Sequence, residues 1–257
     1  MEQREILNYW YADIYEQRQT SVEDVACLLS LVGAEPKRIL EVACGGGRIC
    51  VPLAQAGHSV VGFDMDGAML ERARRKAGLT KNLTLYQADA LNEGWGKDFD
   101  VVVLAGNLLV NIETDGDYQQ AQRLFTRKAA DCLAKGGMMF LDFDVPDWPD
   151  QSEDDRHEWV CFEGIDDRGT YGKYVVISGD YSRKARIDRS FRRYEITPAQ
   201  GQPFVEERQV TKHFPVLQQV IDWCHDEGFE VEQLFQDYQK NPAGTDASHA
   251  VVWARKN

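Results

Sequence analysis

A carboxylate and a glycine-rich turn lie side by side in the run ILEVACGGGRICV (39–51), where Glu41 precedes Gly45 by four residues. A glycine-rich turn between a strand and a helix lets a ligand approach the backbone, and the helix N-terminus offers N–H groups to an anion. Glu41 would repel the phosphates of a dinucleotide at this place. The pattern therefore favours a cationic ligand, for instance one with an ammonium and a sulfonium group.

The dinucleotide motif G-x-G-x-x-G is incomplete at the same turn. Started at Gly45, it runs through Gly47 and then meets Cys50 where the third glycine is required. The missing glycine weakens the prediction of a nicotinamide cofactor.

The segment EVACGGGR (41–48) resembles motif I of the class I S-adenosylmethionine-dependent methyltransferases. The resemblance extends through Asp64, Asp89 and the start of the fifth expected strand. It covers about the first 145 residues and, more weakly, the C-terminal EGFEVE and SHAVVWARK. It implies S-adenosyl-L-methionine as cofactor, with a set of motif I residues packed against its methionine part. These are Glu41, Ala43, Gly45 and Gly47, and Ala43 stands where glycine is common.

Further candidates follow the second and third expected strands. Asp64 ends one of them, where its carboxylate can accept both ribose hydroxyls. By the same resemblance, Met65 contacts the adenine face, Asp89 accepts from the adenine amino group, and the Ala90 backbone N–H faces the ring. The alternative for both acids is a helix or turn cap.

The segment LAGNLLVNI (104–112) is expected to line the methyl-transfer face, with Ala105 beside the cofactor. It lacks the N-P-P-Y type tetrad of nucleic-acid amino-methyltransferases and looks somewhat like the GNS region of glycine-type small-molecule N-methyltransferases. Asn107 is a candidate for holding the acceptor or for catalysis, and it is equally a candidate for closing a turn.

The N-terminal YWYADIYE (9–16) resembles the helix that covers the cofactor in this family. On that basis Tyr11 and Arg18 are candidates for contacting the cofactor carboxylate. The alternative is an amphipathic helix that buries Trp10 and Ile14 at i, i+4 spacing.

A later segment, SRKARIDRSFRR (182–193), concentrates basic residues in an acidic chain. Arg189 and Arg193 alternate onto one strand face and are candidates for binding an anionic acceptor. A solvated edge strand is the favoured alternative. His213 is a candidate general base, although a structural role is the simpler explanation.

Alternating strand-like and helix-like segments must position these residues. They predict an α/β fold with a Rossmann-like, doubly wound, mostly parallel seven-stranded sheet and an inserted antiparallel β layer. We expect the Rossmann-like domain, with an N-terminal helical cap, to comprise 1–145 and 215–257, and the inserted substrate lid to comprise 146–214. The helices include 66–78, with Asp66 as N-cap and Gly78 beyond its end, and 117–137 with a glycine stop.

Composition narrows the function class. The 257 residues carry a net charge of -13, which disfavours nucleic acid and anionic membranes as partners. The six cysteines are scattered without a C-x-x-C pair, which predicts reduced thiols and no metal site. The chain shows no signal peptide or membrane span, so we expect a cytoplasmic protein, either a monomer or a homodimer.

The sequence therefore predicts an enzyme that transfers a methyl group from S-adenosylmethionine to a small-molecule amine or hydroxyl by in-line displacement. A non-catalytic or regulatory S-adenosylmethionine-binding module is the first alternative. An NAD-dependent dehydrogenase is the second.

Overall fold

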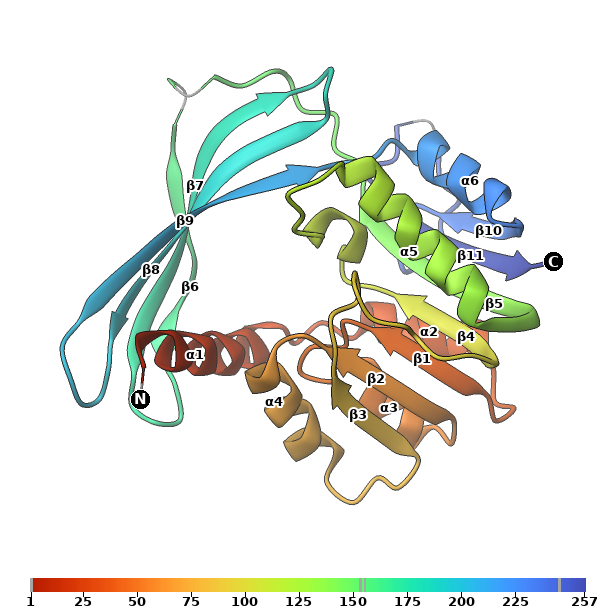
Figure 1. The fold of residues 1–257 in the computed structure, drawn as a ribbon, viewed down its shortest axis with the longest axis horizontal. Helices are drawn as coiled ribbons and strands as arrows, with labels where there is room; N and C mark the ends of the chain where they lie inside the picture. The colour runs from red at the N-terminus through yellow and green to blue at the C-terminus, as the bar shows by residue number, and fades with distance from the viewer. Residues whose placement is uncertain (1, 153, 155, 245) are drawn as a thin grey trace. The chain divides into compact units, whose positions relative to one another are not determined.

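The computed structural model describes residues 2–152, 154, 156–244 and 246–257, and it divides into two compact units (Figure 1). One unit comprises Ser21–Asp147 and Phe214–Asn257. The other comprises the helix α1 (Gln3–Arg18) and Trp148–His213.

The larger unit is built on a seven-stranded sheet with strand order β10-β11-β5-β4-β1-β2-β3. The neighbouring strands among β1 to β5 pair in parallel. The strand β11 is antiparallel to both of its neighbours, β5 and β10. This confirms the predicted Rossmann-like, mostly parallel sheet. Its strands are β1 (Arg38–Val42), β2 (Ser59–Asp64), β3 (Leu83–Gln87), β4 (Phe99–Leu104), β5 (Leu133–Asp144), β10 (Phe229–Phe235) and β11 (His249–Lys256).

Helices connect these strands, and the helix over 67–77 has capping residues at both ends. Asp66 accepts from the Ala68 and Met69 N–H groups at 2.8 and 3.3 Å, and Gly78 follows the helix with φ 54°, so both predicted ends of this helix are confirmed. The helices are α2 (Glu23–Val32), α3 (Cys50–Gln55), α4 (Gly67–Ala77), the short 3-10 helix η1 (Leu108–Asn111), α5 (Tyr118–Cys132) and α6 (Leu217–Asp226).

The junction of α5 and β5 differs from the prediction. A helix was expected to continue to Gly137, but α5 ends at Cys132 and β5 begins at Leu133. Gly136 has φ 75°, and a Cβ on Gly137 would lie 2.9 Å from the Ala134 carbonyl oxygen. The two glycines therefore lie at an irregularity within β5, which coincides with a register shift against β4.

The smaller unit confirms the predicted antiparallel layer, a four-stranded sheet with strand order β6-β7-β8-β9. Its core contains Trp10 and Ile14 of α1, packed with Tyr194 and Ile196. This confirms the alternative prediction that α1 is an amphipathic helix that buries Trp10 and Ile14. A Cβ on Gly172 would overlap the Trp10 indole, so glycine is required there. The strands are β6 (Glu158–Ile165), β7 (Tyr171–Ser182), β8 (Ile187–Thr197) and β9 (Phe204–His213).

Two features of this unit differ from expectation. The helix α1 groups with the antiparallel sheet, whereas the expected division assigned it to the Rossmann-like domain. The basic run lies on β8, which is paired on both sides, so the expectation of an edge strand is wrong.

Among the described residues, none of the helices has the length and apolar character needed to cross a bilayer. The same residues contain no group of three or more His, Cys, Asp or Glu side chains suited to a metal ion.

Candidate functional site

The glycine-rich turn follows the carboxyl end of β1 in the chain. Hydrogen bonds link this turn to the carboxyl end of β2. Parallel pairing sets Val42 beside Phe63, and the Cys44 N–H donates to the Phe63 carbonyl at 2.9 Å. The next residue, Gly45, donates its N–H to Asp64 Oδ2 at 2.8 Å. The sequence candidates Gly45 and Asp64 are thus brought into direct contact at the edge of the sheet where such folds bind ligands.

Asp64 is fixed by backbone donors on both carboxylate oxygens. In addition to Gly45, the Asp66 N–H donates to Asp64 Oδ1 at 2.8 Å. The N-cap of α4 is Asp66 and not Asp64, so helix capping does not account for this acid, whereas its bond from the Asp66 N–H is a turn cap, the other part of the alternative. Burial raises the pKa of Asp64, and the bonds from Asp66 and Gly45 lower it in part. Each oxygen keeps acceptor capacity for a further donor such as a ribose hydroxyl.

Three residues of motif I have left-handed backbone. Ala43 has φ 55°, Gly45 has φ 51° and Gly47 has φ 75°. An alanine with left-handed backbone has a steric cost that glycine does not have. This explains why glycine is common at position 43 in the family that motif I resembles. A Cβ on Gly47 would lie 3.0 Å from both Ala73 Cβ and Val51 Cγ2. The turn thus lies close against α4 and α3.

Glu41 is a buried acid without a cationic partner in contact with it. It is 5% exposed, and among the described residues no hydrogen-bond partner reaches its Oε2 atom. Burial, together with the Cys50 thiol to which it is hydrogen bonded, raises the pKa of Glu41 well above its usual range. The charge of Arg48 acts in the opposite direction with a smaller effect, and Arg48 is itself ion-paired with Asp24. An unpaired buried acceptor of this kind is suited to an incoming donor.

Asp89 follows β3 and holds a turn. Its Oδ1 accepts from the Leu91 N–H at 2.8 Å, and its Oδ2 accepts from Asn92 Nδ2 at 2.7 Å. The Asn92 bond lowers the pKa of Asp89, with burial acting weakly in the opposite direction. The Ala90 carbonyl is held by Trp95 Nε1 at 2.9 Å and by Lys128 Nζ at 2.8 Å. Asp89 therefore caps this turn, and its adenine contact stays a prediction.

Met65, assigned to the adenine face by resemblance, is 70% exposed. It immediately follows Asp64 and lies at the same end of the sheet. A large apolar side chain so exposed beside a glycine-rich turn is consistent with a surface that a planar ring covers.

Asn107 lies just beyond β4 in a left-handed conformation, φ 61°. Its Nδ2 donates to Asp144 Oδ2 at 2.7 Å, its Oδ1 accepts from the Asp144 N–H at 2.6 Å, and its own N–H donates to Asp142 Oδ1 at 2.9 Å. The Asn107 amide therefore ties the end of β4 to the end of β5. Ala105, at the end of β4, packs against the core.

Sequence reasoning missed a polar network at the end of β5. Asp142 is fully buried and accepts from the Tyr238 hydroxyl at 3.0 Å, and burial raises the pKa of Asp142. Asp144 Oδ1 lies 2.9 Å from His249 Nδ1. Burial alone would lower the pKa of His249, but the Asp144 bond and the charge of Asp142 raise it above its usual value. The alternating acids in FLDFD were a signal for this network, whereas its partner His249 follows only from the register of β11 with β5.

Three candidates lie in the smaller unit. Tyr11 packs its ring 5.6 Å from that of Tyr174. Arg18 Nη2 donates to the Glu163 carbonyl at 2.9 Å. His213 ends β9 and is 3% exposed. The cofactor roles of Tyr11 and Arg18 and the base role of His213 stay predictions.

Arg189 and Arg193 have carboxylate partners within the antiparallel sheet. Arg189 Nη1 lies 2.7 Å from Asp180 Oδ2. Arg193 lies 2.8 Å from Glu158 and 3.0 Å from Glu195. These ion pairs favour the alternative reading, a charged and solvated strand face, although on an interior strand.

The fold and the site together define a class of protein. Acids and a glycine-rich turn stand at the carboxyl ends of β1, β2 and β3 of a doubly wound sheet, which is the arrangement of a domain that binds a nucleoside-containing cofactor. The buried carboxylate of Glu41 in the turn distinguishes it from a pyrophosphate site.

Comparison with known proteins specifies the class. Residues 39–137 match the family model of the methyltransferase domain. A ubiquinone biosynthesis O-methyltransferase of Chelativorans sp. (strain BNC1) is 37% identical over 110 residues, 42% of this chain and 40% of that protein. Glycine N-methyltransferase of Mus musculus is 29% identical over 149 residues, 54% of this chain and 51% of that protein. The chain thus spans about half the length of these relatives or less.

Solved structures share the fold over almost the entire chain. The CcbJ methyltransferase from Streptomyces caelestis superposes with a TM-score of 0.74 at 18% identity, covering 97% of this chain and 98% of that one. An amino pentose methyltransferase from Micromonospora echinaspora, with S-adenosylmethionine bound, superposes with a TM-score of 0.63 at 18% identity, covering 96% of each chain. These structures share the fold of this chain, and residues 39–137 within the domain of the seven-stranded sheet match a methyltransferase domain.

Proposed function

We propose that this protein transfers a methyl group from S-adenosylmethionine to a small-molecule acceptor, an amine or a hydroxyl. The observation that carries the proposal is Asp64. Its carboxylate is held by the Gly45 and Asp66 N–H groups at 2.8 Å each, at the end of β2. The match of residues 39–137 to the methyltransferase domain supports the same conclusion.

The residues of the turn fit this cofactor in chemistry. The unpartnered Oε2 of Glu41 suits the ammonium group of the methionine part, because a cation there neutralises a buried acid. Asp64 suits the two ribose hydroxyls, and the left-handed glycines keep the turn free of side chains. When bound, the cofactor supplies an electrophilic methyl group on a sulfonium.

The residues of the chain contribute to the reaction by positioning the cofactor and the acceptor. Transfer requires the acceptor lone pair to lie opposite the leaving sulfur, so holding both partners supplies much of the rate enhancement. The Asn107–Asp144 bonds fix the ends of β4 and β5, the region where the acceptor is expected. A neutral amine needs no base, whereas a hydroxyl must lose its proton to a side chain.

The small-molecule relatives support the acceptor class. Named activities among them include ubiquinone biosynthesis O-methylation and glycine N-methylation. The net charge of -13 supports the same class, since it opposes binding of nucleic acid.

The test compares Asp64→Asn with Asp66→Asn. Asparagine still caps a helix, so Asp66→Asn is a matched control that keeps α4 intact. Calorimetry with S-adenosylhomocysteine should show at least about a tenfold loss of affinity for Asp64→Asn and little change for the control, because only the former removes a charged acceptor. Equal affinities in the two variants would remove Asp64 from the site.

Turnover distinguishes the proposal from its alternatives. Incubation with methyl-labelled S-adenosylmethionine and pools of small amines, phenols and hydroxy acids should transfer label. Cofactor binding without transfer to any pool would favour the non-catalytic module. A thermal stabilisation by NAD rather than by S-adenosylmethionine would favour the dehydrogenase.

A further inference from the structure

The strand β8 carries arginines on both of its faces, and the two sets have different partners. Arg189 and Arg193 share one face, and each forms an ion pair with a carboxylate of another strand, Asp180 of β7 and Glu158 of β6 respectively. The residues that alternate with them point to the opposite face, which includes Ser190, Arg192 and Tyr194. This second face is the buried one, since these three side chains are 3%, 9% and 7% exposed.

Arg192 is a buried guanidinium bonded only to neutral oxygens. Its Nη1 donates to Ser190 Oγ at 2.9 Å and to the Phe191 carbonyl at 3.2 Å. Within the described part of the chain, it forms no ion pair. The carboxylate linked to it is that of Asp188, which accepts from the Ser190 hydroxyl at 2.8 Å. A buried charge is ordinarily paired directly, so this arrangement calls for an explanation.

A second arginine stands directly opposite. The register of β8 with β9 pairs Arg192 with Arg208, and like charges in this position destabilise a sheet. Arg208 is hydrogen bonded to the Tyr194 hydroxyl. On β9, Glu206 is the carboxylate opposite Tyr194 in the register.

Aromatic rings border the arginine pair. Tyr174 stacks on Tyr194 with ring centroids 4.9 Å apart and an interplanar angle of 8°. Burial raises the pKa of Tyr174, and the charges of Arg192 and Arg208 act against this rise. Tyrosine hydroxyls are further donors to an anion.

We propose that Arg192 and Arg208, with the tyrosines beside them, form an anion-binding site that receives a carboxylate or phosphate of the methyl acceptor. The proposal rests on the proposed methyl transfer and narrows its acceptor to an anionic small molecule. An anion at this place would supply the ionic partner that the buried Arg192 lacks among the described residues, with Arg208 opposite as a second cation. The adjacent rings favour an acceptor with a planar or apolar part next to its anionic group.

The test uses aromatic probes that differ in charge. Ligand-observed NMR titrations with benzoate, phenyl phosphate and benzamide would be compared for the wild type, Arg192→Gln, Arg208→Gln and Arg193→Gln. The last variant is the matched control, because Arg193 lies on the same strand with its carboxylates already in place. At least one anionic probe should bind the wild type, and its affinity should fall at least about tenfold in the first two variants and stay within about twofold in the control.

The two anionic probes separate carboxylate from phosphate recognition. Benzamide has the same ring without the charge, so it should bind weakly and respond to none of the substitutions. Arg208 is exposed, which makes Arg208→Gln the variant whose fold is safe if Arg192→Gln proves unstable. Equal loss in Arg193→Gln, or equal binding of benzamide and the anions to the wild type, would overturn the proposal.

Calorimetry with S-adenosylhomocysteine on the same samples keeps the two proposals apart. Failure of the wild type to bind this nucleoside would count against methyl transfer while leaving the anion site to stand or fall on its own titrations. Normal nucleoside binding with no arginine-dependent anion binding would reject the anion site alone.

Discussion

At the scale of single residues, the environment of Glu41 sets its chemistry. The same carboxyl in solvent would be an ordinary surface acid, but here it is 5% exposed, with one oxygen unpartnered among the described residues. Its raised pKa means that the native state keeps a proton on Glu41 at pH values where the unfolded chain has lost it. The unfolded state then binds fewer protons, so the free energy of unfolding falls as pH rises from about 4.5 towards the pKa of the folded state.

This gives a prediction for Glu41→Gln. The variant lacks the titrating group, so its stability relative to the wild type should increase as pH rises across that window. Urea unfolding at pH 5 and pH 8 measures this, with Glu71→Gln as control, because Glu71 is a half-exposed acid paired with Arg75 on α4. The same variant should bind S-adenosylhomocysteine more weakly, by about tenfold, because the amide cannot neutralise an ammonium. A stability difference that is independent of pH would show that Glu41 is ionised in the native state.

At the scale of elements, the glycine turn shows how a backbone conformation becomes a requirement on sequence. Gly47→Ala places a Cβ 3.0 Å from two neighbours at φ 75°, whereas Gly45→Ala meets nothing within 4 Å at φ 51°. We expect Gly47→Ala to lower the free energy of unfolding by about 2–4 kcal/mol and Gly45→Ala by about 1–2 kcal/mol. Chemical denaturation of both variants tests the order. Equal losses would mean that α4 shifts away from the turn at no cost.

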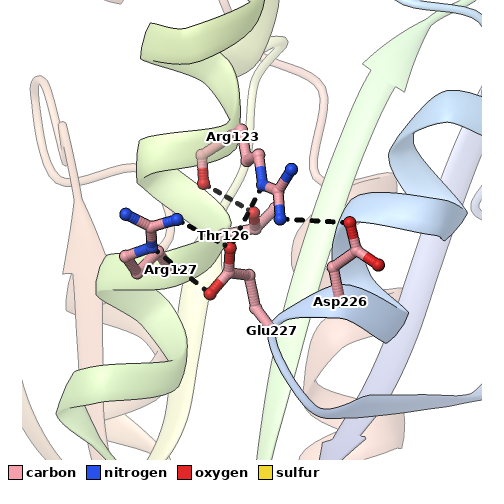
Figure 2. Close-up of polar contacts among 5 residues, drawn as sticks. All are labelled: Arg123, Thr126, Arg127, Asp226 and Glu227. Atoms are coloured by element: carbon pink, nitrogen blue, oxygen red, sulfur yellow. Dashed lines mark hydrogen bonds and ion pairs between the residues drawn. The ribbon is translucent and has the colours of Figure 1, made fainter.

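A second prediction concerns the contact of α5 with the end of α6 (Figure 2). Glu227 accepts from Arg123 Nε at 3.2 Å and from Arg127 at 3.3 Å, and Arg123 also pairs with Asp226 at 3.0 Å. Burial of Glu227 opposes ionisation, but the two arginines lower its pKa below the usual value. The stability from this cluster is therefore present above about pH 4.5 and is lost as pH falls through the lowered pKa.

Glu227→Gln should then lower the free energy of unfolding at pH 7 by about 1 kcal/mol, since the cluster is partly exposed and screened. The difference should shrink below pH 4 and in high salt. Glu230→Gln, an exposed acid on β10, is the control. A loss that persists in acid would indicate a packing role for Glu227 instead of an electrostatic one.

The elements also show which features a sequence can predict. Asp66 and Gly78 predicted the ends of α4 because capping is local, and the alternating apolar runs predicted the parallel strands. The start of β5 was missed, because the irregularity at Gly136 and Gly137 depends on contact with β4. The Asp144–His249 pair was missed for a similar reason, since it joins segments 105 residues apart. Non-local register, rather than residue type, was the missing information.

At the scale of the whole molecule, two compact units hold different sets of candidates. Glu41, Gly45 and Asp64 lie in the unit of the parallel sheet, and Arg189 and Arg193 lie in the antiparallel unit. Arg189→Ala combined with Arg193→Ala should therefore leave the dissociation constant of S-adenosylhomocysteine within about twofold, because the lost pairs are surface ion pairs. Calorimetry on a sample with unchanged circular dichroism measures this. A collapse of nucleoside affinity would place these arginines in the cofactor site.

The position of β11 in the sheet has a consequence for synthesis of the chain. β5 is an interior strand, flanked by β4 on one side and by β11 on the other, yet β11 leaves the ribosome more than a hundred residues after β5. Until β11 is made, β5 is the edge strand of the parallel sheet. Its unpaired edge belongs to an apolar run that includes Met139, Leu141 and Phe143. Open apolar edges recruit other strands, so the nascent chain passes through a stage at which self-association competes with completion of the sheet.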